Sequence, residues 1–292
     1  MVAYHPLDAR FPRRLRTLAP PDVFAAEGPL AERLDELGHT VAIVGTRRPS
    51  VEALAFTTRL AMLLAQAGVV VVSGGARGID TAAHEAALAA GGRTVAVLPG
   101  AIDAWVPACN ASLFRRIRET GALVSITLRG RKPRFLARNG VIAALADNVV
   151  VTAAPRESGA RNTANWARSL DKPLWVVPGS PWDPMMEGCA RELTIGAARA
   201  LSEPEQLVRH LFPNERVPPR RRATTEEIPL PFSEAPSVPQ AIVARLRGGP
   251  MTVDALVAVT SREARDIAAT LLSLELDGVV RDCGDGRFAL VS

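Results

Sequence analysis

The sequence predicts an α/β protein: an extended, Rossmann-like, mostly parallel sheet with helices on both faces, plus a small C-terminal winged-helix domain. From residue 41 to residue 177, β-branched runs alternate with helical stretches, as in parallel βα units with right-handed crossovers. Four consecutive valines at 69–72 indicate a strand buried on both faces. After a proline-rich break, three helical stretches and a hairpin follow in residues 238–292, a pattern typical of a winged helix.

Composition excludes several classes of protein. The chain has 292 residues, is 48% hydrophobic and 22% charged, and is long enough for two domains with sizeable cores. We expect a soluble protein of the reducing cytoplasm, because no run reaches the roughly 20 apolar residues of a membrane span and the N-terminus lacks a signal peptide's apolar segment. The three cysteines are far apart and form no C-x-x-C pair, so neither disulfides nor a zinc site is indicated. The net charge of +5 permits a polyanionic partner without requiring one.

Residues 1–40 are expected to form an N-terminal arm that lies on the main domain. This stretch has prolines at positions 12, 20, 21 and 29 among short apolar pieces, and it ends in an expected helix at Leu30–Leu37. The βα units then begin with a strand at Val41–Val44 and a helix at Val51–Ala67. The turn between them carries Arg47 and Arg48.

The stretch VVVVSGGARGID at 69–80 is the central unit of the predicted sheet. Gly74, Gly75 and Gly78 allow a sharp turn whose N–H groups point outward at a helix N-terminus, for which Asp80 is the expected N-cap. Arg77 adds a charged fork that matches phosphate oxygens. The glycine spacing matches neither the dinucleotide fingerprint nor the P-loop, so a purely structural turn is the alternative to a phosphate site.

The remaining units complete the expected main domain, residues 41–211. The expected strands are Thr94–Leu98, Ala122–Ile126, Asn148–Ala153 and Pro173–Val177, and the expected helices are Ala111–Thr120, Leu136–Ala146 and Asn162–Leu170. Ligands of such sheets bind at the carboxyl ends of the strands, so Arg47 and Arg77 are expected to face one crevice. The basic loop at 129–134 is either a phosphate contact or a solvated surface.

Residues 212–237 have many prolines, mixed charges and no apolar period, which predicts a linker. The winged-helix domain is expected at 238–292, with its third helix capped by Ser261. Such helices often read duplex DNA. This one offers Arg262 and Arg265 but also several acidic residues, which favours protein contact or dimer support over DNA reading.

Four segments resemble the DprA (Smf) family of DNA-processing proteins in order and spacing. They are VAIVGTRRPS at 41–50, SGGARGID at 73–80, Arg138-Asn139 followed by IAALAD, and Pro178-Gly179. The resemblance covers nearly the whole chain, including the winged helix that many members carry. It implies an extended Rossmann-like domain that binds single-stranded DNA, dimerises, protects incoming DNA and helps load RecA during natural transformation. The resemblance implies no catalytic activity, metal or cofactor.

The chain departs from the usual family pattern mainly in its second half. Position 75 has glycine where the family usually has leucine. Position 126 has isoleucine where the family usually has an acidic residue, and position 140 has glycine where it usually has arginine. The usual hydrophobic-Glu-Ala run is Thr152-Ala153-Ala154, and the usual Gly-x-Asn is Gly188-Cys189-Ala190. These departures concern the far wall of the expected pocket and are compatible with a specialised paralogue.

We expect backbone contact to dominate DNA binding, because only 4% of the residues are aromatic and stacking side chains are scarce. The candidate phosphate cradle consists of Arg47, Gly74, Arg77 and Gly78. Arg138 and Asn139 are placed on its rim, and Ser73 is a minor donor.

Enzymatic alternatives are less well supported. Asp80 and His84 share a helix face, an arrangement that suggests acid–base chemistry. The simpler interpretation is structural: Asp80 caps the start of the helix and His84 is a hydrogen-bonded histidine. A nucleotide-processing hydrolase on a related sheet is the main alternative function. The turns at Pro99-Gly100-Ala101 and Pro178-Gly179-Ser180 lack the catalytic glutamate that such enzymes carry. The chain also lacks the glycine fingerprint that a dinucleotide-dependent oxidoreductase carries.

Overall fold

The structure, a computed structural model, describes residues 1–5, 8, 10–18, 24–127, 131–180, 182–213, 238–260, 264–284 and 286–291. The chain divides into two compact units, residues 1–220 and 221–292. The described ranges leave out Pro6, Pro20 and Pro21 of the arm, Arg129 of the basic loop, residues 214–237 of the expected linker, and residues 261–263, which include the expected cap Ser261.

The first unit is built on a sheet that, within the described residues, has nine strands in the order β1-β2-β6-β5-β4-β3-β7-β8-β9. All neighbours from β6 to β9 are parallel. The parallel strands are β3 (Thr40–Gly45), β4 (Val70–Ser73), β5 (Thr94–Leu98), β6 (Ala122–Ser125), β7 (Asn148–Ala153), β8 (Leu174–Val176) and β9 (Arg199–Ala200). The chain builds outward from β3 to β6 and then returns to place β7 on the other side of β3. The boundary between β3 and β7 is therefore the topological switch point of the sheet.

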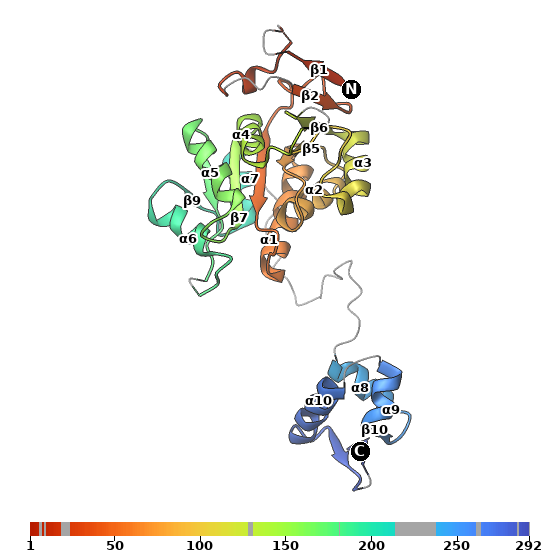
Figure 1. Cartoon of the computed structure of the whole chain (residues 1–292). Coiled ribbons are helices and arrows are strands. Elements are labelled where there is room, and N and C mark those ends of the chain that lie inside the picture. Colours follow the sequence, from red (N-terminus) through yellow and green to blue (C-terminus); the bar gives the residue numbers. More distant parts are fainter. Residues whose placement is uncertain are drawn as a thin grey trace. The chain divides into compact units, whose positions relative to one another are not determined.

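Helices cover both faces of this sheet (Figure 1). On one face α1 packs against α2 and α7, and α3 lies beside α2; on the other face α4 packs against α5. The helices are α1 (Val51–Gln66), α2 (Ile79–Ala89), α3 (Ala111–Thr120), α4 (Phe135–Leu145), α5 (Gly159–Ser169), α6 (Glu187–Thr194) and α7 (Pro204–Leu211), with short 3-10 turns η1 (Arg13–Leu15) and η2 (Ala108–Asn110). The expected Rossmann-like architecture is confirmed.

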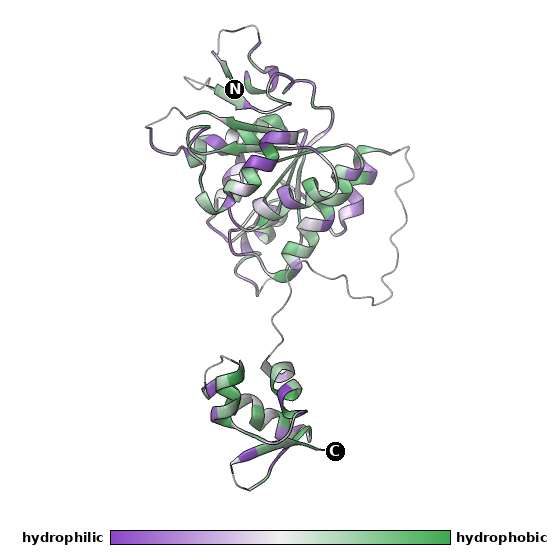
Figure 2. Cartoon of the chain, turned by 90° about the vertical axis from the view of Figure 1, so that its right-hand side faces the viewer, coloured by the Kyte–Doolittle hydropathy of each residue, from purple (hydrophilic) through white to green (hydrophobic). Residues whose placement is uncertain are grey.

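Apolar residues are concentrated in the strands and on the helix faces that meet them, as the green ribbon at the centre of the unit shows (Figure 2). Val70, Val71 and Val72 have no exposed surface, as their uninterrupted run predicts. Serines begin two of the helices: Ser50 Oγ accepts the Ala53 N–H at 3.2 Å, and Ser158 Oγ accepts the Arg161 N–H at 3.3 Å.

The N-terminal arm is part of the sheet rather than a segment that lies on it. Strand β1 (Val2–Tyr4) pairs antiparallel with β2 (Phe24–Glu27), and β2 pairs antiparallel with β6. The helix expected at Leu30–Leu37 is wrong. The segment forms successive turns closed by N–H groups that reach back three residues, and Leu30, Leu34 and Leu37 are nevertheless buried. Separate turns therefore bury the same apolar side chains that suggested a helix.

The second unit has the expected winged-helix composition. Its elements are α8 (Val238–Leu246), β10 (Met251–Thr252), α9 (Val253–Thr260), α10 (Ala264–Leu276), β11 (Val280–Asp282) and β12 (Arg287–Leu290). The strands form an antiparallel sheet in the order β10-β12-β11. Its own core contains Ile242, Leu256, Ile267 and Leu271. Among the described helices of both units, none is long and apolar enough to cross a membrane.

Candidate functional site

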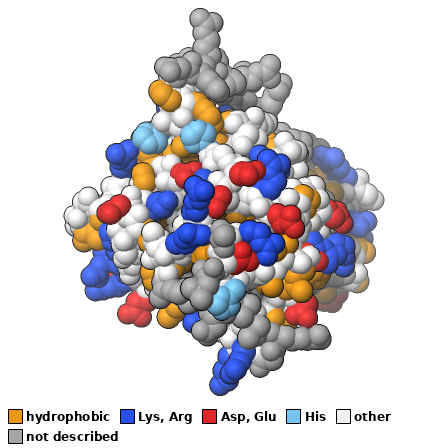
Figure 3. Space-filling model, turned by 90° about the horizontal axis from the view of Figure 1, so that it is seen from above, with side chains coloured by type: hydrophobic (Ala, Val, Ile, Leu, Met, Phe, Trp, Pro, Cys, Tyr) orange, Lys and Arg blue, Asp and Glu red, His pale blue; other side chains and the backbone are white. Residues whose placement is uncertain are grey.

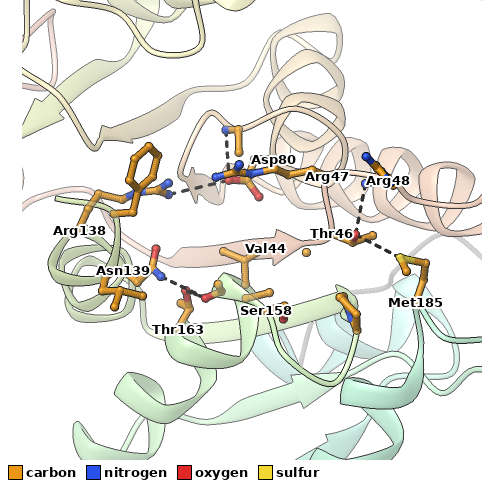
Figure 4. Close-up of a pocket in the computed structure, with 17 residues that line it drawn as sticks. Val44, Thr46, Arg47, Arg48, Asp80, Arg138, Asn139, Ser158, Thr163 and Met185 are labelled. Carbon is orange, nitrogen blue, oxygen red and sulfur yellow. Dashed lines mark hydrogen bonds and ion pairs between the residues drawn. The ribbon is translucent and has the colours of Figure 1, made fainter. Parts of the chain in front are cut away.

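A pocket of about 340 Å³ opens at the switch point between β3 and β7 (Figure 4). Five segments form its wall: residues 44–48 at the end of β3 and in the loop after it, the loop from β4 into α2, the start of α4, the loop from β7 into α5, and the loop before α6. The lining residues are Val44, Gly45, Thr46, Arg47, Arg48, Ala76, Asp80, Phe135, Leu136, Arg138, Asn139, Pro155, Ser158, Gly159, Ala160, Thr163 and Met185. The location is where open α/β sheets bind their ligands.

Arg138 is the central cation of this pocket. Its side chain is 7% exposed, and its Nη1 lies 3.9 Å from Oδ2 of Asp80, whose side chain is 6% exposed. The Nε–H of Arg138 has no hydrogen-bond partner in the described part of the chain. Burial lowers the pKa of the Arg138 guanidinium, Asp80 opposes that change, and Arg47 adds to it. A buried guanidinium with an unused donor is costly unless an anion completes its hydrogen bonds.

Asp80 holds the loop after β4 in place. Its Oδ2 accepts the Ala76 N–H at 3.3 Å, and burial raises its pKa against the opposing effects of Arg138 and nearby backbone N–H groups. Asp80 is in the first turn of α2, whereas the N-cap position is taken by Gly78, so the expected N-cap role is wrong. A side chain at Gly74 would collide with Arg138 Nη1, so glycine there leaves room for the guanidinium.

Arg47 and Arg48 enter the pocket wall from the loop after β3. The Thr46 hydroxyl accepts the Arg48 N–H at 3.2 Å and lies 3.6 Å from Met185 Sδ. The Arg47 guanidinium lies over the Phe135 ring, 5.7 Å from its centroid. Gly78, at φ +81°, brings the next loop so close that a Cβ would lie 2.5 Å from the Thr46 carbonyl oxygen. The glycine-containing loop after β4 therefore packs against the arginine-bearing turn between β3 and α1.

The pocket contains three of the residues that the sequence singled out: Arg47, Arg138 and Asn139. Both Nδ2 hydrogens of Asn139 are used within the protein, on the Gly159 carbonyl and the Asn162 Oδ1, each at 3.1 Å. Asn139 thus ties α4 to α5 and fixes the wall of the pocket.

Ser73 and Arg77 lie elsewhere. The Ser73 hydroxyl has no exposed surface and donates to the Ile43 carbonyl at 2.6 Å. Arg77 is exposed, and its Nε–H donates to Cys109 Sγ at 3.2 Å. Arg47 and Arg77 therefore do not share one crevice in the structure, because the loop after β4 directs Arg77 toward η2. Arg77 remains available at the surface beside the pocket.

The pocket also has an apolar side that was not predicted from the sequence. Phe135 and Leu136 begin α4 and line the pocket with 40% and 64% of their surfaces exposed. The sequence contained one signal for these two residues: they are large and apolar, and they directly follow a run of basic residues at the start of a helix. Met185 comes from the distant loop after β8 and had no sequence signal.

Most departures from the family pattern have a structural use in this chain. Phe114 of α3 occupies the space at Gly75, where a Cβ would lie 2.5 Å from its Cε1, and Trp166 of α5 similarly lies 3.0 Å from a Cβ built at Gly140. Thr152 shares a hydrogen bond of 3.0 Å with Thr57 of α1. Cys189, at the variable position of the Gly-x-Asn run, is buried, which raises the pKa of its thiol to about 12 and makes it unreactive.

His84 has a structural partner. The Thr94 hydroxyl donates to the Val71 carbonyl at 2.7 Å, so it accepts from His84 Nδ1 at 2.6 Å, which assigns the imidazole hydrogen to Nδ1. Burial, with Arg138 nearby, lowers the pKa of His84 to about 3. The interpretation as a hydrogen-bonded histidine is confirmed. Across the described ranges, no group of three histidine, cysteine or carboxylate side chains is placed to hold a metal ion.

Basic residues are not gathered into one continuous surface on the face of the molecule shown in Figure 3, where lysines and arginines alternate with aspartates and glutamates. In the pocket the balance differs, because Arg47, Arg48 and Arg138 are accompanied there by a single acidic lining residue, Asp80. The positive charge of the pocket is therefore local.

Comparison with known proteins gives a consistent result. The profile of the family described as DNA recombination-mediator protein A matches residues 3–212, and that of the DprA winged helix domain matches residues 226–286. Among curated relatives, Protein Smf of Synechocystis sp. is 33% identical over 94% of this chain and 76% of its own length. The putative DNA processing protein DprA of Mycobacterium tuberculosis is 37% identical over 93% of this chain and 69% of its own length.

Two solved structures share the fold of the first unit. DNA processing protein A of Helicobacter pylori, described with a single-stranded DNA binding mode, has a TM-score of 0.64 and 31% identity over 70% of this chain and 93% of that chain. DNA processing protein A of Streptococcus pneumoniae has a TM-score of 0.65 and 30% identity over 71% of this chain and 73% of that chain.

Proposed function

The chain belongs to the DprA (Smf) family, and we propose that it binds single-stranded DNA through the pocket at the β3–β7 switch point. In this proposal the protein protects incoming DNA as a homodimer and helps load the RecA recombinase in transformation. The RecA and dimer parts rest on family resemblance, whereas the DNA site is argued from the pocket itself.

One observation carries the proposal: the buried Arg138 guanidinium lines the pocket with its Nε–H unpartnered among the described residues. A phosphate oxygen in the pocket would accept hydrogen bonds from the Arg138 guanidinium and from Arg47. Charge-assisted hydrogen bonds of this kind are about twice as strong as neutral ones, and they strengthen where water is excluded. Asp80 neutralises part of the charge of Arg138, so a phosphate would be held mainly by the surplus positive charge from Arg47 and Arg48.

The loop glycines contribute shape to this site. Gly74 leaves space for Arg138, and Gly78 lets the loop after β4 pack on the backbone of Thr46 and Arg47. In the proposal both glycines set the distance between the arginines. Arg77 lies outside the pocket and would meet a neighbouring phosphate of a strand that runs across the surface. Asn139 fixes the wall of the pocket. Ser73 contributes to the site indirectly, through its hydrogen bond to strand β3.

A nucleotide-processing hydrolase is the alternative function, and the pocket chemistry does not favour it. Such a reaction needs a carboxylate free to act on the substrate. Asp80, the acidic side chain of the pocket lining, is instead committed to Arg138 and to the Ala76 N–H. We therefore propose binding without turnover of nucleoside monophosphates or nicotinamide cofactors.

The deciding experiment is a titration of the full chain with single-stranded and duplex oligonucleotides of equal length. The proposal predicts tighter binding to the single strand, with no preference among unrelated sequences. It also predicts that added nucleoside monophosphates are recovered unchanged. Preference for the duplex, or hydrolysis that depends on pocket residues, would contradict it.

We propose that the winged-helix unit supports protein contact or dimerisation rather than the primary DNA site. The phosphate pocket lies wholly in the first unit, and the two units have separate cores. A chain ended after Pro213 should therefore keep its single-strand affinity within about tenfold, or roughly 1.4 kcal/mol. A larger loss would assign the winged helix to the DNA site.

A further inference from the structure

Trp182 is the most exposed large apolar side chain in the described part of the chain, at 88%. The other three tryptophans are used within the fold. Trp105 and Trp175 donate their indole N–H to the Ile102 carbonyl and the Asn148 Oδ1, each at 3.0 Å, and Trp166 packs on Gly140. An isolated exposed apolar residue is common on protein surfaces, so exposure alone assigns no role to Trp182.

Hydrogen bonds among the described residues 180 and 182–186 hold the backbone near Trp182. The Trp182 N–H donates to Ser180 Oγ at 3.3 Å, and the Asp183 N–H donates to the Ser180 carbonyl at 3.1 Å. Asp183 in turn accepts the Met185 N–H with Oδ1 at 2.8 Å and the Met186 N–H with its carbonyl at 2.9 Å. The backbone that carries the indole is therefore already held by hydrogen bonds. Binding of a ligand to the indole would then cost little conformational entropy of this backbone.

The same loop forms part of the phosphate pocket. Met185 lines the pocket and contacts the Thr46 hydroxyl, and Thr46 is adjacent to Arg47. Met185 is three positions after Trp182, so their Cα atoms are at most about 11 Å apart. At roughly 3.4 Å per nucleotide of a stacked strand, that distance corresponds to about three nucleotides. A strand with one phosphate in the pocket can therefore place a nearby base against Trp182.

We propose that Trp182 is a stacking platform for a base of the single strand, one to three nucleotides from the phosphate held by the pocket. This inference rests on the proposed function. An aromatic face accepts every base, so Trp182 adds affinity without sequence preference, in keeping with a pocket that recognises phosphate. An indole provides the largest stacking face among the side chains, and it compensates for the low aromatic content of the chain.

The test uses full-length protein and two strands of equal length and charge, one a thymidine oligonucleotide and the other abasic throughout its centre. We expect Trp182→Ala to weaken binding of the thymidine strand about tenfold and to leave the abasic strand unaffected, with unchanged salt dependence. Trp182→Phe should restore most of the affinity. Indole fluorescence should be quenched by the thymidine strand in the parent and much less in the alanine variant. Ile195→Ala removes another exposed apolar side chain, at the end of α6, and should bind as the parent does.

The outcomes separate this inference from the proposed function. If Trp182→Ala binds both strands as the parent does, the stacking role is wrong while single-strand binding stands. If it weakens both strands equally, or changes the oligomeric state in sedimentation, Trp182 acts on the backbone or on a second copy, and the stacking role is again wrong. If the parent binds neither strand, the proposed function itself fails.

Discussion

The guanidinium of Arg138 and the carboxylate of Asp80 face each other beneath the loop that follows β4, with Nη1 and Oδ2 3.9 Å apart and both side chains buried. This pair joins α4 to the start of α2 across the carboxyl edge of the sheet. The carboxylate fastens the loop through the Ala76 N–H, and the guanidinium has a buried Nε–H that no described residue accepts. The same two residues therefore hold the loop and contribute one charge of each sign to the pocket lining.

Replacing Arg138 by methionine should separate these two roles. The variant keeps much of the side-chain volume and leaves the buried Asp80 carboxylate without its cation, which typically lowers the free energy of unfolding by about 3–5 kcal/mol. Single-strand affinity should fall as well. The double variant Asp80→Asn, Arg138→Met removes both charges and should recover stability, but not affinity, in denaturant unfolding and DNA titrations. Recovery of affinity in the double variant would show that Arg138 acts through the fold alone.

Replacing Arg47 by alanine should weaken single-strand binding equally for unrelated sequences, because a phosphate contact carries no base information. For single strands, log K falls with log salt by about 0.7 per neutralised phosphate, so the slope should become shallower by about 0.7 to 1. Arg93→Ala removes the same charge from an exposed position just before β5, at the opposite edge of the sheet, and serves as the control. Equal slopes for the parent and Arg47→Ala would exclude Arg47 from phosphate binding.

Much of the fold follows from local sequence patterns. Strands Thr94–Leu98 and Asn148–Ala153 and helix Ala111–Thr120 have the bounds that their patterns predict, because apolar runs and flanking turn residues agree there. Strands β1 and β2 were missed because both are short, and they are stabilised by pairing with each other and, for β2, with β6 far along the chain. Leu30–Leu37 was misjudged because a period of three to four residues also fits consecutive turns.

The site was less predictable, because side-chain direction depends on tertiary packing. Glycines at 74 and 78 indicated a tight loop, yet Arg77 in that loop points to Cys109 while Arg47 enters the pocket. Arg138 was expected at a helix start, on the rim of the phosphate cradle. Its burial follows from α4 lying over the switch point, a relationship between segments some sixty residues apart that no local pattern contains.

Acid should destabilise the protein through His84. The folded protein keeps His84 neutral until its pKa of about 3, whereas the unfolded chain takes up a proton near pH 6.5, so the unfolded state binds more protons between these values. Stability should therefore fall as pH is lowered from about 6.5 toward about 3, with a contribution approaching 1.4 kcal/mol per pH unit. Urea titrations of the parent and His84→Gln across this range measure the effect. The variant should show a flatter dependence, and identical slopes would rule out His84 as the source.

The last prediction concerns the glycines of the loop after β4, which we expect to act through space as well as through backbone freedom. Gly78 has φ +81°, and a Cβ there would lie 2.5 Å from the Thr46 carbonyl oxygen. Gly91 has φ +73° with open space around it. Gly91→Ala should lower the free energy of unfolding by about 1–2 kcal/mol, because alanine is strained at this positive φ. It should not change DNA affinity.

Gly78→Ala should cost more stability, because the new methyl group also pushes on the backbone of Thr46 and Arg47. It should weaken single-strand binding too, because that backbone positions Arg47 relative to Arg138. Thermal unfolding and titration with one oligonucleotide, performed on both variants, distinguish the two effects. If Gly78→Ala loses stability but binds as tightly as Gly91→Ala does, the spacing between the two loops does not control the pocket, and Gly78 serves the turn alone.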